Sequence, residues 1–158
     1  MKKIHITLII LSTLFYFGCE EKNISCTDLT KKEVYHDIVK GTITLYYDED
    51  ELFTGKCMTW GSLVGYEDME TSIKDGYRWG VQKCWYSYSQ NKLKFERNFG
   101  KGILHGDFIE WWENGQIKEK GEYVGGRKKI YDSQCFDVDG NDIMCEELKE
   151  EIDKIIKK

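Results

Sequence analysis

The sequence of 158 residues contains no proline and only three histidines, one of which lies within the first five residues. Without proline, the turns depend on glycine, asparagine and aspartate, and 15 glycines are available. Three histidines argue against a metal enzyme with several histidine ligands. The formal net charge of −5 lacks the positive excess of nucleic-acid-binding proteins, so we expect no nucleic-acid partner. With 41% hydrophobic and 32% charged residues, the chain is typical of a globular protein of one small domain.

The N-terminal apolar run is too short to be a permanent membrane span. As a helix, residues 4–17 would extend about 21 Å, whereas the hydrocarbon core of a bilayer is about 30 Å thick. The run follows Lys2 and Lys3 and ends at Gly18-Cys19. A short apolar run behind positive charges is typical of a cleaved export signal.

Gly18 and Cys19, at the end of this run, resemble a bacterial lipoprotein box. The resemblance implies a signal peptide over residues 1–18 and a lipid attached to Cys19. It also implies anchoring in the cell envelope, at the outer membrane of a Gram-negative bacterium. The polar residues 19–33 are then expected to form a tether. Ordinary secretion, with Cys19 free or in a disulfide, is the alternative.

A glycine pattern recurs along residues 34–144, which we expect to form one repeat domain. The pair Gly76 and Gly80 recurs as Gly102 and Gly106, and in degraded form as Gly126 and Ile130. A pair of bulky residues follows five and six positions after Gly41, Gly80, Gly106 and Ile130: Tyr46-Tyr47, Trp85-Tyr86, Trp111-Trp112 and Cys135-Phe136. Such self-similarity is typical of stacked supersecondary units.

The third unit predicts a β-hairpin most clearly. Asn114-Gly115 separates two alternating runs, 107–113 and 116–123, and favours a type I′ turn. The resulting register is Trp112 opposite Ile117, Trp111 opposite Lys118 and Phe108 opposite Gly121. Gly121 leaves room for the Phe108 ring. Lys118 is expected to contact the Trp111 ring in a cation–π interaction of about 0.5–1 kcal/mol.

These segments resemble the MORN-repeat-variant family, which is often labelled YwqK-type or antitoxin-like. The likeness rests on Leu104-His105-Gly106, on the run from Trp111 to Lys118, on Tyr123 and Gly126, and on Tyr46 followed by Phe53-Thr54-Gly55-Lys56. It implies an all-β fold, an elongated single-layer antiparallel sheet of MORN-like β-hairpin repeats. The mixed aromatic and charged content of both sheet faces favours such a single layer over a two-layer core.

The last segment, 145–158, predicts a short amphipathic α-helix. Leu148, Ile152, Ile155 and Ile156 form one apolar stripe, with acidic residues in the first turn and lysines at the end. We expect this helix to cap the last hairpin and cover the open sheet edge. A helix that binds a partner is the alternative.

The acidic residues and cysteines near the C-terminus are candidates for a metal site and for a disulfide pair. Asp137 to Asp142 with Glu146 faintly resembles a calcium loop, but the glycine spacing is wrong, and Asp139-Gly140 is more simply a hairpin turn. We therefore expect no metal and no cofactor. Export permits disulfides, and Cys135 with Cys145 is the favoured pair. For Cys26 two outcomes are open, a bridge that ties the tether down or a free thiol. Reduced, buried cysteines are the alternative to disulfides.

The sequence carries no catalytic motif, so we expect a protein that is not an enzyme. His105 lies between two glycines, where a turn residue is expected rather than a general base. Eighteen of the 22 aromatic residues fall between Tyr46 and Phe136, and most of them are needed to support a single-layer sheet. The candidate binding residues are Trp85, Trp111, Trp112 and Lys118.

The expected function is that of a lipid-anchored, non-catalytic binding or scaffold module of the cell envelope. Its expected partners are the membrane, through the lipid anchor, and a protein or another envelope component. The family label supplies the alternative, an antitoxin or immunity-type protein that neutralises a cognate toxin.

Overall fold

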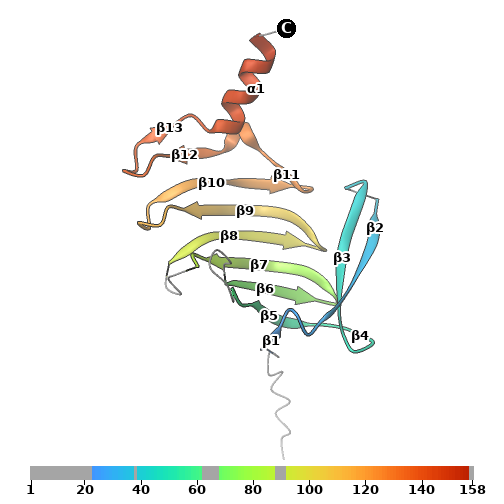
Figure 1. The fold of residues 1–158 in the computed structure, drawn as a ribbon. Helices are drawn as coiled ribbons and strands as arrows, with labels where there is room; N and C mark the ends of the chain where they lie inside the picture. The colour runs from blue at the N-terminus through green and yellow to red at the C-terminus, as the bar shows by residue number, and fades with distance from the viewer. Residues whose placement is uncertain (1–22, 38, 62–67, 88–91, 157–158) are drawn as a thin grey trace, which may run out of the picture.

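The computed structural model describes residues 23–37, 39–61, 68–87 and 92–156 of the chain. The described chain is mostly β, in two open sheets whose strands pair antiparallel except for one parallel pair (Figure 1). The mostly-β, antiparallel part of the expected fold is therefore confirmed. The predicted signal peptide and Cys19 lie outside the described residues.

The larger sheet has ten strands and forms the body of the molecule. In spatial order they are β1 (Asn23–Ser25), β5 (Gly55–Thr59), β6 (Met69–Lys74), β7 (Tyr77–Trp85), β8 (Leu93–Gly100), β9 (Ile103–Trp111), β10 (Ile117–Val124), β12 (Gln134–Phe136) and β13 (Asp142–Ile143). The short β11 (Arg127–Lys128) pairs with β10, and a 3-10 turn, η1 (Ile130–Asp132), precedes β12. From β5 to β10 each strand pairs with the next in sequence, which is the arrangement expected of successive hairpins.

The smaller sheet has three strands, β2 (Thr30–His36), β3 (Gly41–Asp48) and β4 (Glu51–Leu52). It stands across one end of the large sheet (Figure 1). Its β3 passes the turns Asp75-Gly76, Lys101-Gly102 and Gly125-Gly126, in which both residues have positive φ. A Cβ on Gly102 would lie 3.3 Å from Ile43, and the Tyr46 N–H donates to the Gly76 carbonyl at 2.9 Å. These glycines let β3 approach the turns closely.

Part of the expected tether belongs to the fold instead. Residues 23–33 contain β1 and the start of β2, and Cys26 forms a disulfide with Cys57 on β5. Cys26 and Leu29 are buried in one cluster with Phe53, Cys57 and Ile73. A polar composition suggested a tether, but β1 is held by its backbone pairing to β5 and by the disulfide, neither of which a hydropathy pattern shows.

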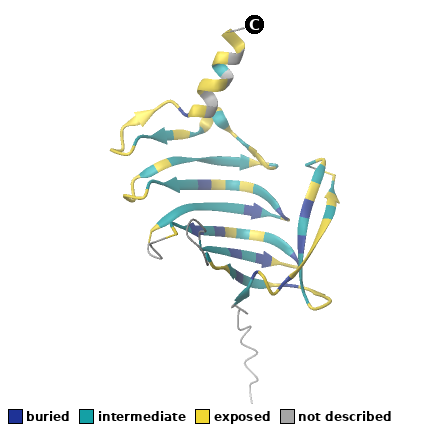
Figure 2. Ribbon diagram, in the orientation of Figure 1, coloured by how far each residue is buried: buried dark blue, intermediate teal, exposed yellow. Residues whose placement is uncertain are grey.

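Buried residues recur along the strands of the large sheet (Figure 2). Pairing and strand alternation place nearly all of them on one face, which we call the inner face. Cross-strand pairing places the following residues in one row on this face: Cys57, Thr71, Gln82, Arg97, Phe108 and Gly121. On the opposite, outer face the neighbouring row contains the ion pair Lys83–Glu96, at 3.1 Å. Among the described residues the largest fully buried side chains are those of Cys57 and Cys84, so the core is thin.

Two successive units share the same backbone geometry. Gly80 on β7 and Gly106 on β9 both have positive φ, 79° and 87°, and each stands at a register shift against the neighbouring strand. The N–H of Gly102 donates to the Arg78 carbonyl, and that of Gly126 donates to the Leu104 carbonyl, both at 2.9 Å. His105 therefore lies in strand β9 beside this irregularity, so the expectation that it is a turn residue is wrong.

The C-terminal helix α1 (Glu146–Ile156) forms where periodicity predicts it, but it is not a cap. It projects away from the sheet (Figure 1), and Ile155 and Ile156 are 61% and 76% exposed. The expectation that it covers the sheet edge is therefore wrong. An apolar stripe shows that one helix face can be buried, but it does not specify which surface will bury it.

We predict that Gly121→Ala destabilises the sheet, because the predicted pairing of Phe108 with Gly121 is confirmed and is tight. A Cβ at position 121 would lie 2.9 Å from Phe108 Cε1 and 2.6 Å from Ser133 Oγ. Overpacking of this kind costs about 1–3 kcal/mol of unfolding free energy in urea denaturation. Gly41→Ala is the control, since its nearest neighbour would be 3.8 Å away. Equal stability of both variants would contradict the argument.

Candidate functional site

The structure separates the four predicted binding residues into two groups. Trp85 lies with Met58, Trp60 and Asp68 in a shallow hollow. Strand alternation places Trp85 and Trp111 on the outer face. Trp112 and Lys118 line a different cavity, at the C-terminal end of the sheet. The four residues therefore do not form one surface, but Trp112 and Lys118 share a cavity.

A β-bulge brings Lys118 to Trp112. Gly115 has a positive φ of 89°, whereas Asn114 does not have a positive φ. A type I′ turn needs positive φ at both residues, so the turn is not of that type. The Gly115 N–H donates to the Trp112 carbonyl, and the Trp112 N–H donates to the Gln116 carbonyl. Trp111 then pairs with Ile117, while Lys118 is an extra residue on β10. A bulge re-aims the side chain next to it.

The predicted pairing of Trp111 with Lys118 is consequently wrong, as is that of Trp112 with Ile117. The Lys118 ammonium lies 5.0 Å from the centre of the Trp112 ring. The contact of Lys118 with Trp112 was missed because the prediction placed both Asn114 and Gly115 in the left-handed conformation, whereas only Gly115 adopts it. An Asn-Gly pair is compatible with both turn geometries, so the sequence alone does not distinguish them.

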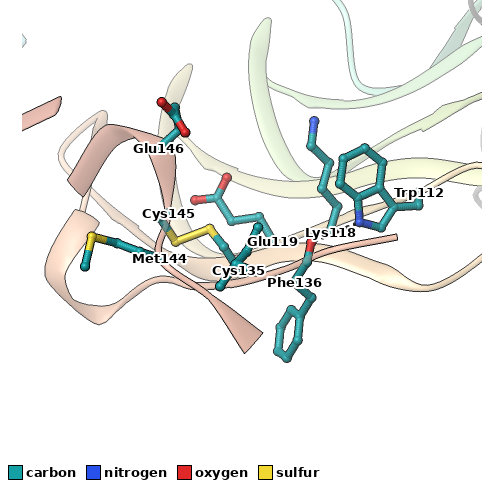
Figure 3. Close-up of a pocket in the computed structure, with 9 residues that line it drawn as sticks. Trp112, Lys118, Glu119, Cys135, Phe136, Met144, Cys145 and Glu146 are labelled. Atoms are coloured by element: carbon teal, nitrogen blue, oxygen red, sulfur yellow. Dashed lines mark hydrogen bonds between the residues drawn. A yellow bond between two sulfur atoms is a disulfide. The ribbon is translucent and has the colours of Figure 1, made fainter. Parts of the chain in front are cut away.

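The cavity has a volume of about 310 Å³, and we call it the C-terminal pocket. Its lining combines apolar and charged side chains: Trp112, Lys118, Glu119, Cys135, Phe136, Ile143, Met144, Cys145 and Glu146. Figure 3 shows Lys118 beside the Trp112 indole, and the Cys135–Cys145 disulfide next to Glu119. The Trp112 indole N–H donates to the Phe136 carbonyl at 3.0 Å, which fixes the ring against β12. The favoured disulfide pair is thereby confirmed.

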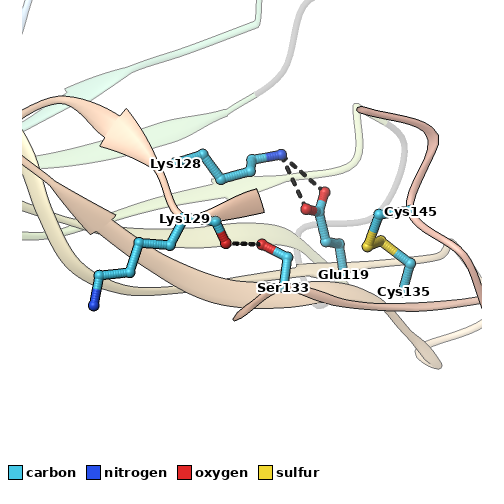
Figure 4. A network of polar contacts seen from close by, with 6 residues as sticks. All are labelled: Glu119, Lys128, Lys129, Ser133, Cys135 and Cys145. Atoms are coloured by element: carbon cyan, nitrogen blue, oxygen red, sulfur yellow. Dashed lines mark hydrogen bonds and ion pairs between the residues drawn. A yellow bond between two sulfur atoms is a disulfide. The ribbon is translucent and has the colours of Figure 1, made fainter. Parts of the chain in front are cut away.

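An ion pair supports one side of the pocket. Lys128 Nζ lies 3.0 and 3.1 Å from the two carboxylate oxygens of Glu119, and both side chains are only 14% exposed (Figure 4). Lys128 also lies 5.2 Å from the centre of the Phe108 ring. Ser133 donates to the Lys129 carbonyl at 3.1 Å and holds the turn before β12. Glu119 is therefore oriented by the fold before any ligand arrives.

Metal binding is a poor match for this cluster. Glu119 and the sulfurs of Cys135 and Cys145 lie within 4.8 Å of one another. A disulfide, however, has no thiolate to offer, and Lys128 already neutralises the carboxylate. The lining instead combines two aromatic rings with one ammonium, that of Lys118, and with the carboxylates of Glu119 and Glu146. Such a lining suits recognition of a mixed polar and apolar group.

The nearby acidic loop is a hairpin turn. The Gly140 N–H donates to the Asp137 carbonyl at 3.1 Å, as expected for Asp139-Gly140 in the turn. Hydrogen bonds from the Asn141 side chain, and then from its backbone, hold the pKa of the Asp137 carboxyl below its ordinary value. The oxygens of Asp137 are thus engaged within the loop.

His36 and His105 line a separate apolar groove with Trp79, Ile103 and Val124. The groove contains neither a carboxylate nor a hydroxyl or thiol nucleophile. Its third titratable side chain is that of Lys101. The site residues that sequence reasoning missed are Glu119, Phe136 and Met144. The predicted hairpin register placed Glu119 on the same face as Trp112, but it gave no position for Phe136 and Met144, which follow in the next hairpin.

We predict that Glu119→Gln costs about 2 kcal/mol of unfolding free energy, because Lys128 would keep its charge in a largely buried position. The measurement is urea denaturation at neutral pH. Glu96→Gln is the matched control, since the Lys83–Glu96 pair is 38% and 31% exposed and should contribute less than about 1 kcal/mol. An equal loss in the two variants would show that burial does not set the contribution of the Glu119–Lys128 pair.

Comparison with known proteins leaves the function to be argued from the site. No protein-family profile, curated protein or solved structure matches this chain. Among the helices that the structure describes, none has the length and apolar character needed to cross a membrane.

Proposed function

We propose that the chain is a non-catalytic binding module that recognises an extended segment of a protein partner at its C-terminal end. The observation that carries this proposal is the juxtaposition of the C-terminal pocket with β13, the last strand of the sheet. A terminal strand offers backbone donors and acceptors to an added strand, and an adjacent pocket selects its side chains.

Exposed apolar residues at the C-terminal pocket also support binding at this end of the molecule. Ile143 and Met144 are 49% and 57% exposed at the pocket, although both are large and hydrophobic. Because β13 has only two residues, it provides few backbone hydrogen bonds, so the pocket must supply most of the binding free energy. Lys118 and Glu146 at the rim favour a segment that carries charges of both signs.

The MORN-like repeat architecture is part of this proposal. Its support is the shared geometry of the units that contain Gly76 and Gly102, with positive φ at equivalent positions. In that architecture the sheet serves as a rigid platform, and the ligand binds where the array ends. Neutralisation of a toxin is a special case in which the bound segment belongs to that toxin.

Location in the cell envelope is the other part of the proposal. It is supported by the lipoprotein-like Gly18-Cys19 and by two disulfides, Cys26–Cys57 and Cys135–Cys145, which suit an oxidising compartment. A lipid on Cys19 would leave the C-terminal pocket at the opposite end of the strand order from β1. The binding end would then be the part of the sheet farthest along the array from the anchored N-terminus.

Crosslinking tests the binding site. We predict that a photoreactive amino acid at Met144 captures a protein partner in the native host, and that Trp112→Ala with Lys118→Ala lowers the yield at least tenfold. A probe at the exposed Tyr35, on β2, is the control and should not capture the same partner. If Trp85→Ala with Trp111→Ala abolished capture while the pocket variant did not, the outer face would be the binding surface and the proposal would fail. Circular dichroism verifies that each variant is folded.

Lipid labelling tests the anchor. Expression in a Gram-negative host with labelled palmitate should give a labelled protein, and Cys19→Ala should remove the label completely. Cys26→Ala is the control, because Cys26 lies in the fold and pairs with Cys57. Retention of the label in Cys19→Ala would exclude acylation at this position.

A further inference from the structure

Two arginines share a cavity that is separate from the C-terminal pocket. Arg78 on β7 and Arg97 on β8 line a hollow of about 250 Å³ between the two sheets. The rest of the lining comes from three regions. These are Val39 with Thr42 and Ile43 on β3, Phe99 on β8 with Ile103 and Leu104 on β9, and the turn glycines Gly102 and Gly126. None of these residues lines the C-terminal pocket.

Both guanidinium groups stack on the same aromatic ring. The Arg78 and Arg97 guanidinium carbons lie 4.4 and 5.7 Å from the centre of the Phe99 ring. Arg97 also lies 4.4 Å from the centre of the Phe95 ring. A guanidinium that stacks on a ring uses its flat face for that contact, and the N–H groups at its edges stay available for hydrogen bonds.

The N–H edges of the two arginines are largely unused by the protein. Arg97 Nε donates to Gln82 Oε1 at 2.8 Å, and Gln82 donates onward to Thr71 at 2.9 Å. Arg78 Nε is buried without an acceptor. Within residues 23–37, 39–61, 68–87 and 92–156, no carboxylate lies within 4.0 Å of either guanidinium. The chain Thr71–Gln82–Arg97 therefore orients a cation without neutralising it.

Two partly buried positive charges that share a cavity and have no carboxylate in contact are unfavourable without an anion. Burial and then the like charge of Arg78 lower the pKa of the Arg97 guanidinium, and the smaller opposing effects of neighbouring groups, Glu110 among them, do not offset this. The contrast with the rest of the sheet is clear, because Lys128 and Lys83 each have a carboxylate partner. Buried charges are usually paired, so the missing partner is expected to come from outside the chain.

We propose that Arg78 and Arg97 form a binding site for an oxyanion, either a carboxylate or a phosphate group. Planar guanidinium forks bind both groups through paired, charge-assisted hydrogen bonds. The cavity volume limits the ligand to a small anion or to the anionic head of a larger molecule. The Thr42 hydroxyl in the lining can supply one more hydrogen bond. This site lies outside the surface proposed above for the protein partner.

Binding to the full chain tests the proposal. Inorganic phosphate and succinate are titrated separately at constant ionic strength, with chloride as the reference anion, and backbone amide shifts of Gly102 and Gly126 are followed by NMR. We expect saturable shifts with at least one of the two anions and none with chloride. The anion with the lower dissociation constant is the preferred oxyanion. Absence of saturation with both anions, or equal shifts with chloride, would overturn the proposal.

Variants connect the binding to the two arginines. Arg78→Lys keeps the charge but lacks the planar fork, and it disturbs no protein hydrogen bond, since Arg78 Nε makes none. We expect it to weaken binding at least tenfold, and Arg97→Lys to do the same. Lys83→Gln on the outer face is the control and should bind as the wild type does. Binding that is unchanged in both arginine variants would refute the assignment.

Discussion

The close crossing of β3 over the glycine turns is the contact on which the rest of the structure depends. A single sheet leaves both of its faces accessible to water, so its apolar side chains need a second layer or large rings to cover them. Here β3 supplies that layer at one end of the strands, where Ile43 meets Gly102 and Val39 lies 3.6 Å from a Cβ placed on Gly126. Farther along the strands Cys84 and Phe108 are still buried, and the Glu119–Lys128 ion pair covers part of the Phe108 ring.

This uneven cover explains why polar groups lie on the inner face. Arg97 and Glu119 both lie on the inner face and are only partly buried, so each is desolvated without being sealed from solvent. Glu119 has an ion-pair partner in Lys128, whereas neither Arg78 nor Arg97 has a carboxylate within 4.0 Å in the described chain. The same physical situation thus gives a structural ion pair at one position and a candidate ligand site at another.

Local signals in the sequence predicted local structure, and the errors arose where one element meets another. Alternation and the Asn-Gly turn gave the pairing of Phe108 with Gly121, but the single bulged residue Lys118 changed the partners of Trp111 and Trp112. Periodicity located α1 but not its direction. Residues 30–33 have no apolar run, yet they belong to β2, because their pairing with β3 depends on backbone hydrogen bonds.

The uncapped end is stable for a reason that also makes it available for binding. In most sheets the last strands are held by burial, which covers their apolar side chains. In this chain β12 and β13 are held by the Cys135–Cys145 disulfide and by the bond from Trp112 to the Phe136 carbonyl. Because a covalent bond and a hydrogen bond hold these strands in place of buried apolar contacts, Ile143 and Met144 remain exposed. An apolar surface beside an open sheet edge is thus left for a partner to cover.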